Sequence, residues 1–297
     1  MTDRDDLEAQ RRSLIGLAYR MLGTVSDAED VVQDALIKWH RHENRAEIES
    51  PRAFLAQVTV RLCLDRLKSA RAKREVYVGP WLPEPVLDGD TLPRDAGVAS
   101  ELASDLSVAL LLALERLSPL ERAAFILHDV FDTDWAEIAV ALERSEAACR
   151  QLASRARAHV RDERPRFRPS TEERDRILQA FGIAVATGDL TALKSLLSKD
   201  AVFVGDGGGE VKSALKPVVG NDRVARLLLG LQAKAVSAGE EHSYTPAWLN
   251  GLPGLLLRGT VRAIQTATFE VDESGLIRAV YVVSNPAKLR HLLPADA

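Results

Sequence analysis

The first part of the chain repeats apolar residues at helical spacing. Leu14, Leu17 and Met21 follow a period of three to four residues, which predicts a helix with one buried face. The segment DAEDVVQDALIKWHR (27–41) repeats this pattern with an apolar stripe on one side and aspartates on another. Residues 7–76 are therefore predicted to form an all-α domain.

Capping signals mark where several helices begin. Ser26 and Glu29 fit a capping box at the start of the second helix. Ser50, followed by proline, fits the N-cap of a third helix, RAFLAQVTVRLCLDRLKSARAKRE (52–75). The sequence Ser118-Pro-Leu-Glu121 predicts another capping box with proline in the first turn.

The second helical block covers residues 100–165. Its segment DWAEIAVALERSEAACRQLASRARAHVR (134–161) reads as two short amphipathic helices, with a tight turn at Glu143 and Arg144 and with Ser145 as the second N-cap. The inner face of the second helix carries small residues, and its outer face is rich in arginine. This pattern predicts a helix-turn-helix.

The third segment, 171–293, changes from helical to strand periodicity. Ser170 and Glu173 predict a capped first helix that ends at Gly188. From Ala201 onward, runs rich in β-branched residues alternate with turn signals such as NGLPG and DESG. We expect an α+β domain with a curved, mainly antiparallel sheet, so the fold class is multidomain: two all-α domains followed by this α+β domain.

The segment YVGPWLPEP (77–85) opens a connector over residues 77–99. Its prolines forbid a helix, while Tyr77 and Trp81 are too apolar for a solvated linker. Such a segment is expected to lie against another surface.

Composition and charge narrow the class of protein. Hydrophobic residues make up 46% and charged residues 28%, as in globular proteins, and the net charge is −4. The start of the chain lacks the apolar region of a signal peptide, and no apolar run reaches the length of a membrane span, so we expect a cytoplasmic protein. Cys63 and Cys149 are expected to be buried structural thiols. With no metal-ligand spacing or phosphate loop, we expect neither metal nor cofactor.

Segments 27–41, 52–75 and 134–161, in this order, resemble a bacterial extracytoplasmic-function (ECF) sigma factor over about residues 7–165. YVGPWLPEP, the run DGGG at 206–209 and NPAKL at 285–289 resemble the subgroup with a C-terminal SnoaL-like domain. That domain belongs to the nuclear-transport-factor-like superfamily of conical α+β folds. The last motif of the subgroup usually has Asp where this chain has Ala287, so this chain lacks that carboxylate.

The resemblance implies binding to core RNA polymerase and to promoter DNA, and it implies roles for particular residues. The polymerase contact would involve an acidic stripe and an aromatic residue: Asp30, Asp34 and Trp39. The loop 42–49 and the following helix would melt and bind the −10 element through cations: Arg61, Arg66, Lys68, Arg71, Lys73 and Arg74. The second helix of the helix-turn-helix would read the −35 element in the major groove through five residues: Ser145, Glu146, Arg150, Gln151 and Arg155.

The connector leads to a regulatory hypothesis. The −10 and −35 elements lie up to about 70 Å apart, and roughly 24 residues reach at most about 80 Å. If nine of them were pinned, the rest would reach only about 50 Å. We therefore expect the C-terminal domain to control promoter binding by holding the connector. The expected contact joins two groups of residues: Tyr77, Pro80, Trp81, Pro83 and Pro85 with Asp206, Gly207, Gly208, Asn285 and Pro286. Whether docking represses or activates is left open.

Two other functions stay open. SnoaL-like relatives include enzymes, so a carboxylate paired with His242 or Tyr244 inside the cone would suggest catalysis, and an apolar pocket would suggest a small-molecule ligand. No such convergence is visible, and we expect no catalytic residue. The other alternative is a helix-turn-helix repressor without polymerase, but nothing resembles the dimer helix that a palindrome reader needs.

Overall fold

The computed structural model describes residues 3–44, 48, 50–74, 77–88, 105–161, 167, 169–239, 242–259 and 264–293, with the backbone alone for 3–9, 69–74 and 242. The chain divides into two compact units. The helical unit contains residues 1–76 and 89–164, and the C-terminal unit contains residues 77–88 and 165–297. The first half of the connector thus belongs to the C-terminal unit.

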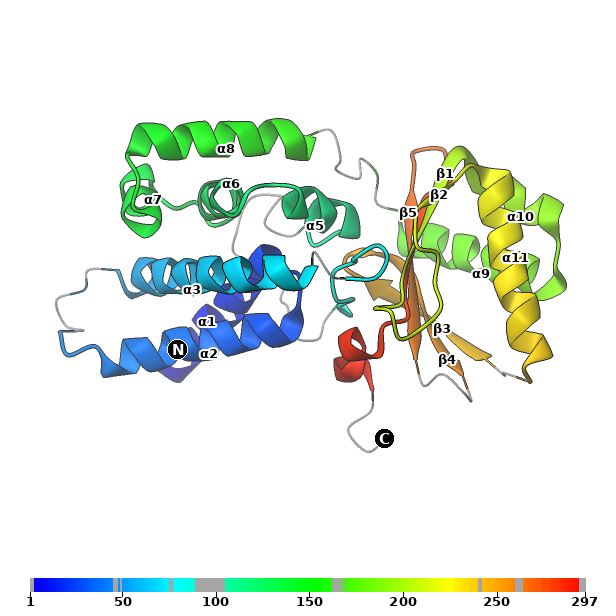
Figure 1. The fold of residues 1–297 in the computed structure, drawn as a ribbon, viewed down its shortest axis with the longest axis horizontal. Helices are drawn as coiled ribbons and strands as arrows, with labels where there is room; N and C mark the ends of the chain where they lie inside the picture. Colours follow the sequence, from blue (N-terminus) through cyan, green and yellow to red (C-terminus); the bar gives the residue numbers. More distant parts are fainter. Residues whose placement is uncertain are drawn as a thin grey trace. The chain divides into compact units, whose positions relative to one another are not determined.

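The helical unit begins with α1 (Asp3–Leu22), α2 (Val25–Arg41) and α3 (Pro51–Arg74), which pack on one another (Figure 1). Ser50 caps α3 as expected, since its hydroxyl accepts a hydrogen bond from the Ala53 amide at 3.2 Å. The predicted capping box of α2 is wrong. The N-cap is Thr24, two residues earlier, so the helix starts at Val25 and Ser26 lies in its first turn. The Thr24 hydroxyl donates to the Asp27 carboxylate at 2.8 Å.

The second half of this unit consists of α5 (Val108–Glu115), α6 (Pro119–Phe125), the wider turn η2 (Ile126–Val130), α7 (Trp135–Leu142) and α8 (Glu146–Arg161). The capping box of Ser118 and Glu121 is present at the start of α6. Helices α7 and α8 form the predicted helix-turn-helix. Glu143 adopts the left-handed conformation at the turn (φ 55°), which costs a residue with a Cβ about 1 kcal/mol.

Two arginines join the halves of the helical unit. Arg61 of α3 donates to the carbonyls of Val140 and Ala141 at the end of α7, at 2.8 and 3.2 Å. Arg122 of α6 is buried and donates to the Met21 carbonyl at 2.5 Å. Burial lowers the pKa of Arg122 to about 10, so the guanidinium stays charged at neutral pH.

In the C-terminal unit, α9 (Thr171–Thr187), α10 (Leu190–Leu196) and α11 (Asn221–Ser237) lie on one side of a sheet (Figure 1). The described strands of the sheet are β1 (Leu197–Asp206), β2 (Val218–Val219), β3 (His242–Leu249), β4 (Leu252–Gly259), β5 (Gln265–Val271) and β6 (Ile277–Val283). Among the described residues their order is β2-β1-β6-β5-β4-β3. All neighbours are antiparallel except β1 and β6, which are parallel.

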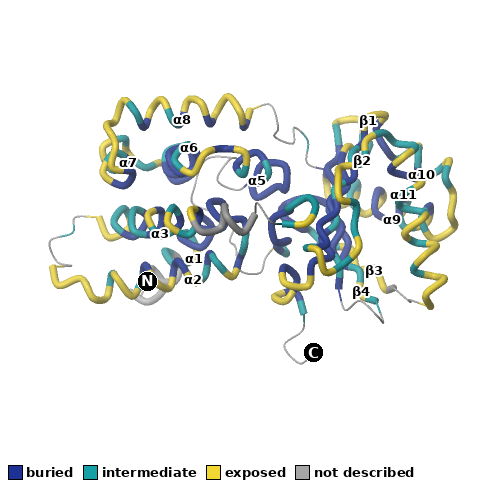
Figure 2. The backbone as a smooth tube through the Cα atoms, in the orientation of Figure 1, coloured by how far each residue is buried: buried dark blue, intermediate teal, exposed yellow. Residues whose placement is uncertain are grey.

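The helices and the sheet enclose an apolar core. Phe181 of α9 meets Phe269 of β5 edge to face, with ring centroids 4.7 Å apart, and Figure 2 shows the buried tube running through the sheet. Asn250 and Gly251, both with positive φ, form the two-residue turn between β3 and β4. The expected fold class, helical domains followed by an α+β domain with a mainly antiparallel sheet, is confirmed. No helix of the described residues is long and apolar enough to span a membrane.

The capping box of α9 gives a prediction about stability. The Ser170 hydroxyl accepts from the Glu173 amide at 3.2 Å, and the Glu173 carboxylate accepts from the Ser170 amide at 2.8 Å. Ser170→Ala should lower the free energy of unfolding of the C-terminal unit by about 1 kcal/mol, measured by urea denaturation. In the control, Ser195→Ala, an exposed serine that bonds only within its own helix is lost, and the change should stay within about 0.5 kcal/mol. Equal effects would contradict the capping role.

Candidate functional site

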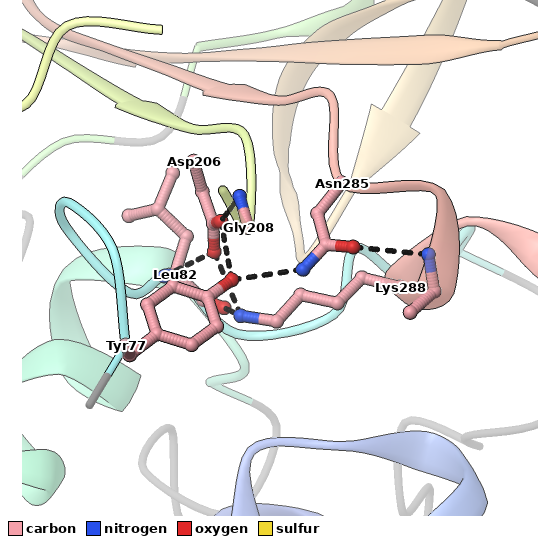
Figure 3. A network of polar contacts seen from close by, with 7 residues as sticks. Tyr77, Leu82, Asp206, Gly208, Asn285 and Lys288 are labelled. Atoms are coloured by element: carbon pink, nitrogen blue, oxygen red, sulfur yellow. Dashed lines mark hydrogen bonds and ion pairs between the residues drawn. The ribbon is translucent and has the colours of Figure 1, made fainter. Parts of the chain in front are cut away.

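The C-terminal unit holds the connector through one buried carboxylate. Asp206, at the end of β1, is fully buried (0% exposed) and accepts four hydrogen bonds (Figure 3). Its Oδ1 accepts from the Tyr77 hydroxyl at 2.5 Å and the Gly208 amide at 3.0 Å. Its Oδ2 accepts from the Leu82 amide at 2.9 Å and from Lys288 Nζ at 2.7 Å. The acceptor sites of this carboxylate are thereby filled, and two of the four donors come from the connector.

Lys288 supplies the opposite charge and also contacts the connector. Its side chain is only 7% exposed, and its ammonium group donates to the Leu82 carbonyl at 2.5 Å as well as to Asp206. The ammonium lies 4.2 Å from the centroid of the Trp81 ring and 5.1 Å from that of Tyr77. A desolvated cation over aromatic faces gains about 2 kcal/mol. We call Tyr77, Trp81, Leu82, Asp206, Asn285 and Lys288 the Asp206 clamp.

Tyr77 and Asn285 complete the clamp. The Asn285 Nδ2 donates to the Tyr77 hydroxyl at 2.8 Å, while its Oδ1 accepts from the Ala287 amide at 3.0 Å. Burial, and then the hydrogen bond to Asp206, raise the pKa of Tyr77 well above its usual value. The phenol is therefore protonated at neutral pH and can donate to the carboxylate. Its contribution to docking is present below pH 10 and is lost as the pH rises beyond that.

Glycines let the loop after β1 approach its partners. At Gly208, which has φ +63°, an added Cβ would lie 2.3 Å from the Asn285 Nδ2. At Gly207 it would lie 2.0 Å from the Val211 carbonyl oxygen, and at Gly209 it would lie 3.3 Å from Val78 of the connector. The run of glycines in this loop thus has a steric reason.

The second half of the docked connector bonds along the turn between β3 and β4. The Val86 amide donates to Asn250 Oδ1 at 3.1 Å, and the Asn250 amide donates to the Val86 carbonyl at 2.8 Å. The Asp88 amide donates to the Trp248 carbonyl at 3.0 Å, and Asp88 Oδ1 accepts from the Gly251 amide at 2.8 Å. These main-chain contacts fix the register of the segment.

The prolines of the connector take different positions. Pro83 and Pro85 are buried, and the Pro85 carbonyl lies 2.8 Å from His291 Nε2. Pro80 is half-buried, whereas Pro286 of the C-terminal motif is exposed. The later part of the expected linker, 89–99, lies outside the described residues.

Sequence reasoning missed several residues of this site: Leu82, Asn250, Lys288 and His291. Lys288 had a signal, because it belongs to the quoted motif NPAKL beside Asn285. Leu82 and Asn250 act largely through main-chain atoms or a turn, which residue type alone does not reveal. Ala287, where the subgroup has Asp, is exposed and contributes its amide to Asn285.

The residues expected to bind polymerase lie on α2. Asp34 is exposed, and Asp30 is exposed and paired with Arg66 at 2.9 Å. Trp39 is half-buried, with its ring centroid 5.5 Å from that of Phe54. The acidic stripe is thus on the surface, while the tryptophan packs partly against α3.

The residues expected at the −10 element are in part engaged within the helical unit. Arg61 bonds the end of α7, and Arg66 is held by Asp27 and Asp30. Lys68 is exposed and pairs with Asp65 at 2.8 Å. The side chains of Arg71, Lys73 and Arg74 lie outside the described residues, as do residues 45–47 and 49 of the preceding loop.

The residues expected at the −35 element gather on the exposed face of α8. Ser145 caps the helix through the Ala148 amide at 3.3 Å, Gln151 is exposed, and Glu146 pairs with Arg150 at 2.9 Å. Arg155 donates to Glu121 at 2.7 Å. This bond, with those from Ser118, lowers the pKa of Glu121.

Little in the C-terminal unit suggests catalysis. Tyr244 is exposed and donates to Gln232 at 3.0 Å, and the side chain of His242 lies outside the described residues. Asp206 is fully engaged in the clamp. The buried Glu270 accepts from Tyr281 at 3.1 Å and alternates along β5 with Phe269, so it faces away from the core beneath the helices. Among the described residues, no group of three His, Cys, Asp or Glu could hold a metal ion.

Comparisons with known proteins match both helical halves and the whole chain. The family described as Sigma-70 region 2 matches residues 7–73, and Sigma-70, region 4 matches residues 107–160. The chain is 39% identical to the ECF RNA polymerase sigma factor SigJ of Mycobacterium tuberculosis, over 95% of this chain and 92% of that protein. It is 34% identical to the probable ECF sigma factor SigI of the same species, over 74% of each. The crystal structure of M. tuberculosis SigJ matches with a TM-score of 0.74 and 37% identity, over 97% of this chain and 98% of that one.

The buried ion pair gives a prediction about docking. Lys288→Met removes the only ammonium that the described residues place on Asp206, and breaking a buried pair from one side costs about 3 kcal/mol or more. Amide hydrogen exchange at Leu82, which donates to Asp206, should accelerate at least about tenfold. Lys216→Met, at an exposed lysine, is the control and should leave this exchange unchanged. Unchanged exchange in Lys288→Met would contradict the clamp.

The glycine run gives a second prediction. Gly208→Ala combines positive φ with a clash against Asn285, whose side chain is fixed at both ends. Gly275→Ala meets only the strain of positive φ, because nothing lies within 4 Å of an added Cβ. Exchange at Leu82 should therefore accelerate in Gly208→Ala and not in Gly275→Ala, although both variants lose about 1 kcal/mol to backbone strain. Similar exchange in the two variants would show that the close approach is unimportant.

Proposed function

The chain belongs to the family of ECF RNA polymerase sigma factors, and on this premise we propose that the Asp206 clamp restrains it from within. It is an alternative sigma factor that directs transcription initiation. The family implies binding to core RNA polymerase and to promoter DNA. In our proposal, the C-terminal unit holds residues 77–88 and so limits how readily the two promoter-reading regions separate.

The proposal rests on one observation: the connector supplies two of the hydrogen-bond donors of the buried Asp206 carboxylate. Without the connector, the carboxylate would lose the donors from Tyr77 and Leu82, and Lys288 would lose the Leu82 carbonyl and the Trp81 ring. A buried polar group left without its partner costs about 1–3 kcal/mol, and more when it is charged. The docked state is therefore strongly favoured, and release must be driven by a competing interaction.

Promoter binding supplies a reason for release. In the helical unit, α3 contacts α6 and α7, whereas the −10 and −35 elements are separated by one to two turns of DNA. With residues 77–88 docked, the separation must be spanned by residues 89–107, which reach at most about 65 Å. Release of the docked residues adds up to about 40 Å of reach. Docking thus leaves a reach slightly below the largest separation of about 70 Å, and release restores it.

We assign the surfaces of the helical unit as the resemblance implies. The acidic face of α2 around Asp30 and Asp34 suits a basic surface of polymerase. The exposed face of α8 around Arg150, Gln151 and Arg155 suits the major groove of the −35 element. Arg61 bonds the end of α7, so its contact with −10 DNA depends on opening of the unit. Arg66 must instead leave Asp27 and Asp30 of α2.

We assign the C-terminal unit a regulatory role and not a catalytic one. Asp206 is occupied by the clamp, and the buried Glu270 accepts a hydrogen bond from Tyr281 on the face of the sheet away from the core. We therefore propose that these carboxylates serve the structure and not acid–base chemistry.

The first test is whether the chain works as a sigma factor. The purified full chain should co-purify with bacterial core RNA polymerase, and together they should start RNA synthesis at a defined position on promoter DNA. Failure to initiate from any site in a library of promoters would reject the function itself.

The second test addresses the restraint. Trp81→Ala removes the aromatic face over Lys288, which is worth about 2 kcal/mol when desolvated. Because binding that requires the released state is weakened by the fraction docked, the apparent affinity of the holoenzyme for promoter DNA should rise several-fold. Val219→Ala, at an exposed position on β2, is the control. In a chain that ends at residue 165, Trp81→Ala should have no effect, and an equal effect there, or weaker binding in the full chain, would refute the restraint.

A further inference from the structure

The connection between α6 and α7 has an unusual backbone that fixes an aromatic pair. In η2 the Phe131 amide donates to the Ile126 carbonyl at 3.1 Å, five residues back, and Asp132 follows with φ 52°. Wide turns of this kind are frequent at functional sites. The result is that His128 stacks on Trp135, with ring centroids 3.9 Å apart and planes 33° apart.

The same connection fixes the histidine from its other side. His128 Nδ1 lies 3.2 Å from the Thr133 carbonyl, and the Thr133 amide donates to the Leu127 carbonyl at 2.9 Å. Trp135, the first residue of α7, is therefore held by a ring that is itself tied to the backbone. The core of the domain does not require this arrangement, since Trp135 is only half-buried.

Arg150 of α8 lies over this tryptophan. Its guanidinium carbon is 5.4 Å from the centroid of the Trp135 ring, and its Nη2 donates to Glu146 at 2.9 Å. The side chain is still 53% exposed, and it comes from the first turns of α8, the part of a recognition helix that contacts base edges. A contact through the face of the guanidinium leaves the N–H groups at its edge for hydrogen bonds, one of which Nη2 already makes to Glu146.

Two other arginines of this helix, Arg155 and Arg157, are held differently. Arg155 donates through Nε to Glu121, and Arg157 donates through Nε to Asp129, each at 2.7 Å. Both guanidinium groups are therefore partly used by carboxylates of other elements. Arg150 is instead oriented by an aromatic ring and a carboxylate of its own helix.

We propose that Trp135 is a specificity-determining positioning residue, which orients Arg150 to read a guanine in the −35 element. The proposal rests on the proposed function, since it needs the helix-turn-helix to read DNA. An arginine side chain loses about 2 kcal/mol of rotamer freedom when it is fixed. Trp135 fixes it before DNA arrives, so less is lost when the bidentate contact to guanine forms.

The test compares Trp135→Phe with Trp135→Leu in the full chain, assembled with core RNA polymerase. Phenylalanine keeps an aromatic face under Arg150, whereas leucine keeps apolar bulk without one. Each holoenzyme selects promoters from a library with randomised −35 bases, read out by sequencing the transcripts. Arg150→Ala identifies the base pair that Arg150 reads, and Gln151→Ala serves as the control that should affect a different base pair.

We expect the wild type and Trp135→Phe to prefer guanine at the Arg150 position by about tenfold or more, and Trp135→Leu to lose that preference there alone. Trp135→Leu combined with Arg150→Ala should lose nothing further at this position. If the two Trp135 variants behave alike, whether both keep the preference, both lose it or both fail to fold, the proposal is overturned. If the wild-type holoenzyme selects no promoter at all, the proposed function fails instead.

Discussion

The C-terminal unit is organised around one carboxylate, Asp206, that is fully removed from water. The burial of the Asp206 carboxylate requires its full set of hydrogen-bond donors, because a buried polar group without partners is costly. The unit itself supplies two of these donors, the Gly208 amide and Lys288, and the connector supplies Tyr77 and Leu82. The connector is therefore part of how this domain satisfies its own interior.

The sheet topology explains why this carboxylate meets its lysine. Strands β1 and β6 are parallel, and their pairing is regular from Val202 to Asp206. The carboxyl ends of both strands therefore lie side by side. The Ser284 amide then donates to the Asp206 carbonyl at 2.8 Å, and the short turn η3 (Pro286–Lys288) begins directly after it. The parallel pairing of two strands far apart in sequence thus places Lys288 beside Asp206, and the connector closes over both.

The parts of the fold with strong local signals could be predicted from sequence. The capping boxes at Ser118 and Ser170 combine a cap residue, a glutamate three positions later and, at Ser118, a proline, and both are present. The box predicted at Ser26 is absent, because the helix begins at Val25 and Ser26 lies within its first turn. The helix-turn-helix could be predicted despite the absence of glycine at its turn, since its inner face of small residues outweighs about 1 kcal/mol of strain at Glu143.

Only part of the functional site could be predicted from the sequence. Prolines and aromatics in YVGPWLPEP showed that the connector needs a partner, and the glycine run showed where a backbone comes close. The buried lysine was not foreseen, because a lysine near a chain end is solvated in most proteins and only the strand register reveals that it is buried. The contacts of Leu82, Val86 and Asp88 use main-chain atoms, which carry no mark in the sequence.

Two sets of contacts oppose separation of the promoter-reading regions. Within the helical unit, Arg61 bonds the end of α7 with a side chain that is 48% exposed, so water can replace these bonds at little cost. Arg122 is buried, and separation must also break its bond to the Met21 carbonyl. The Asp206 clamp is buried as well, and its release exposes an ion pair and an indole together. Release of the connector therefore adds the cost of a buried ion pair to the cost of opening the helical unit. Through Lys288 and Asp206, the C-terminal unit takes part in deciding when the regions can separate.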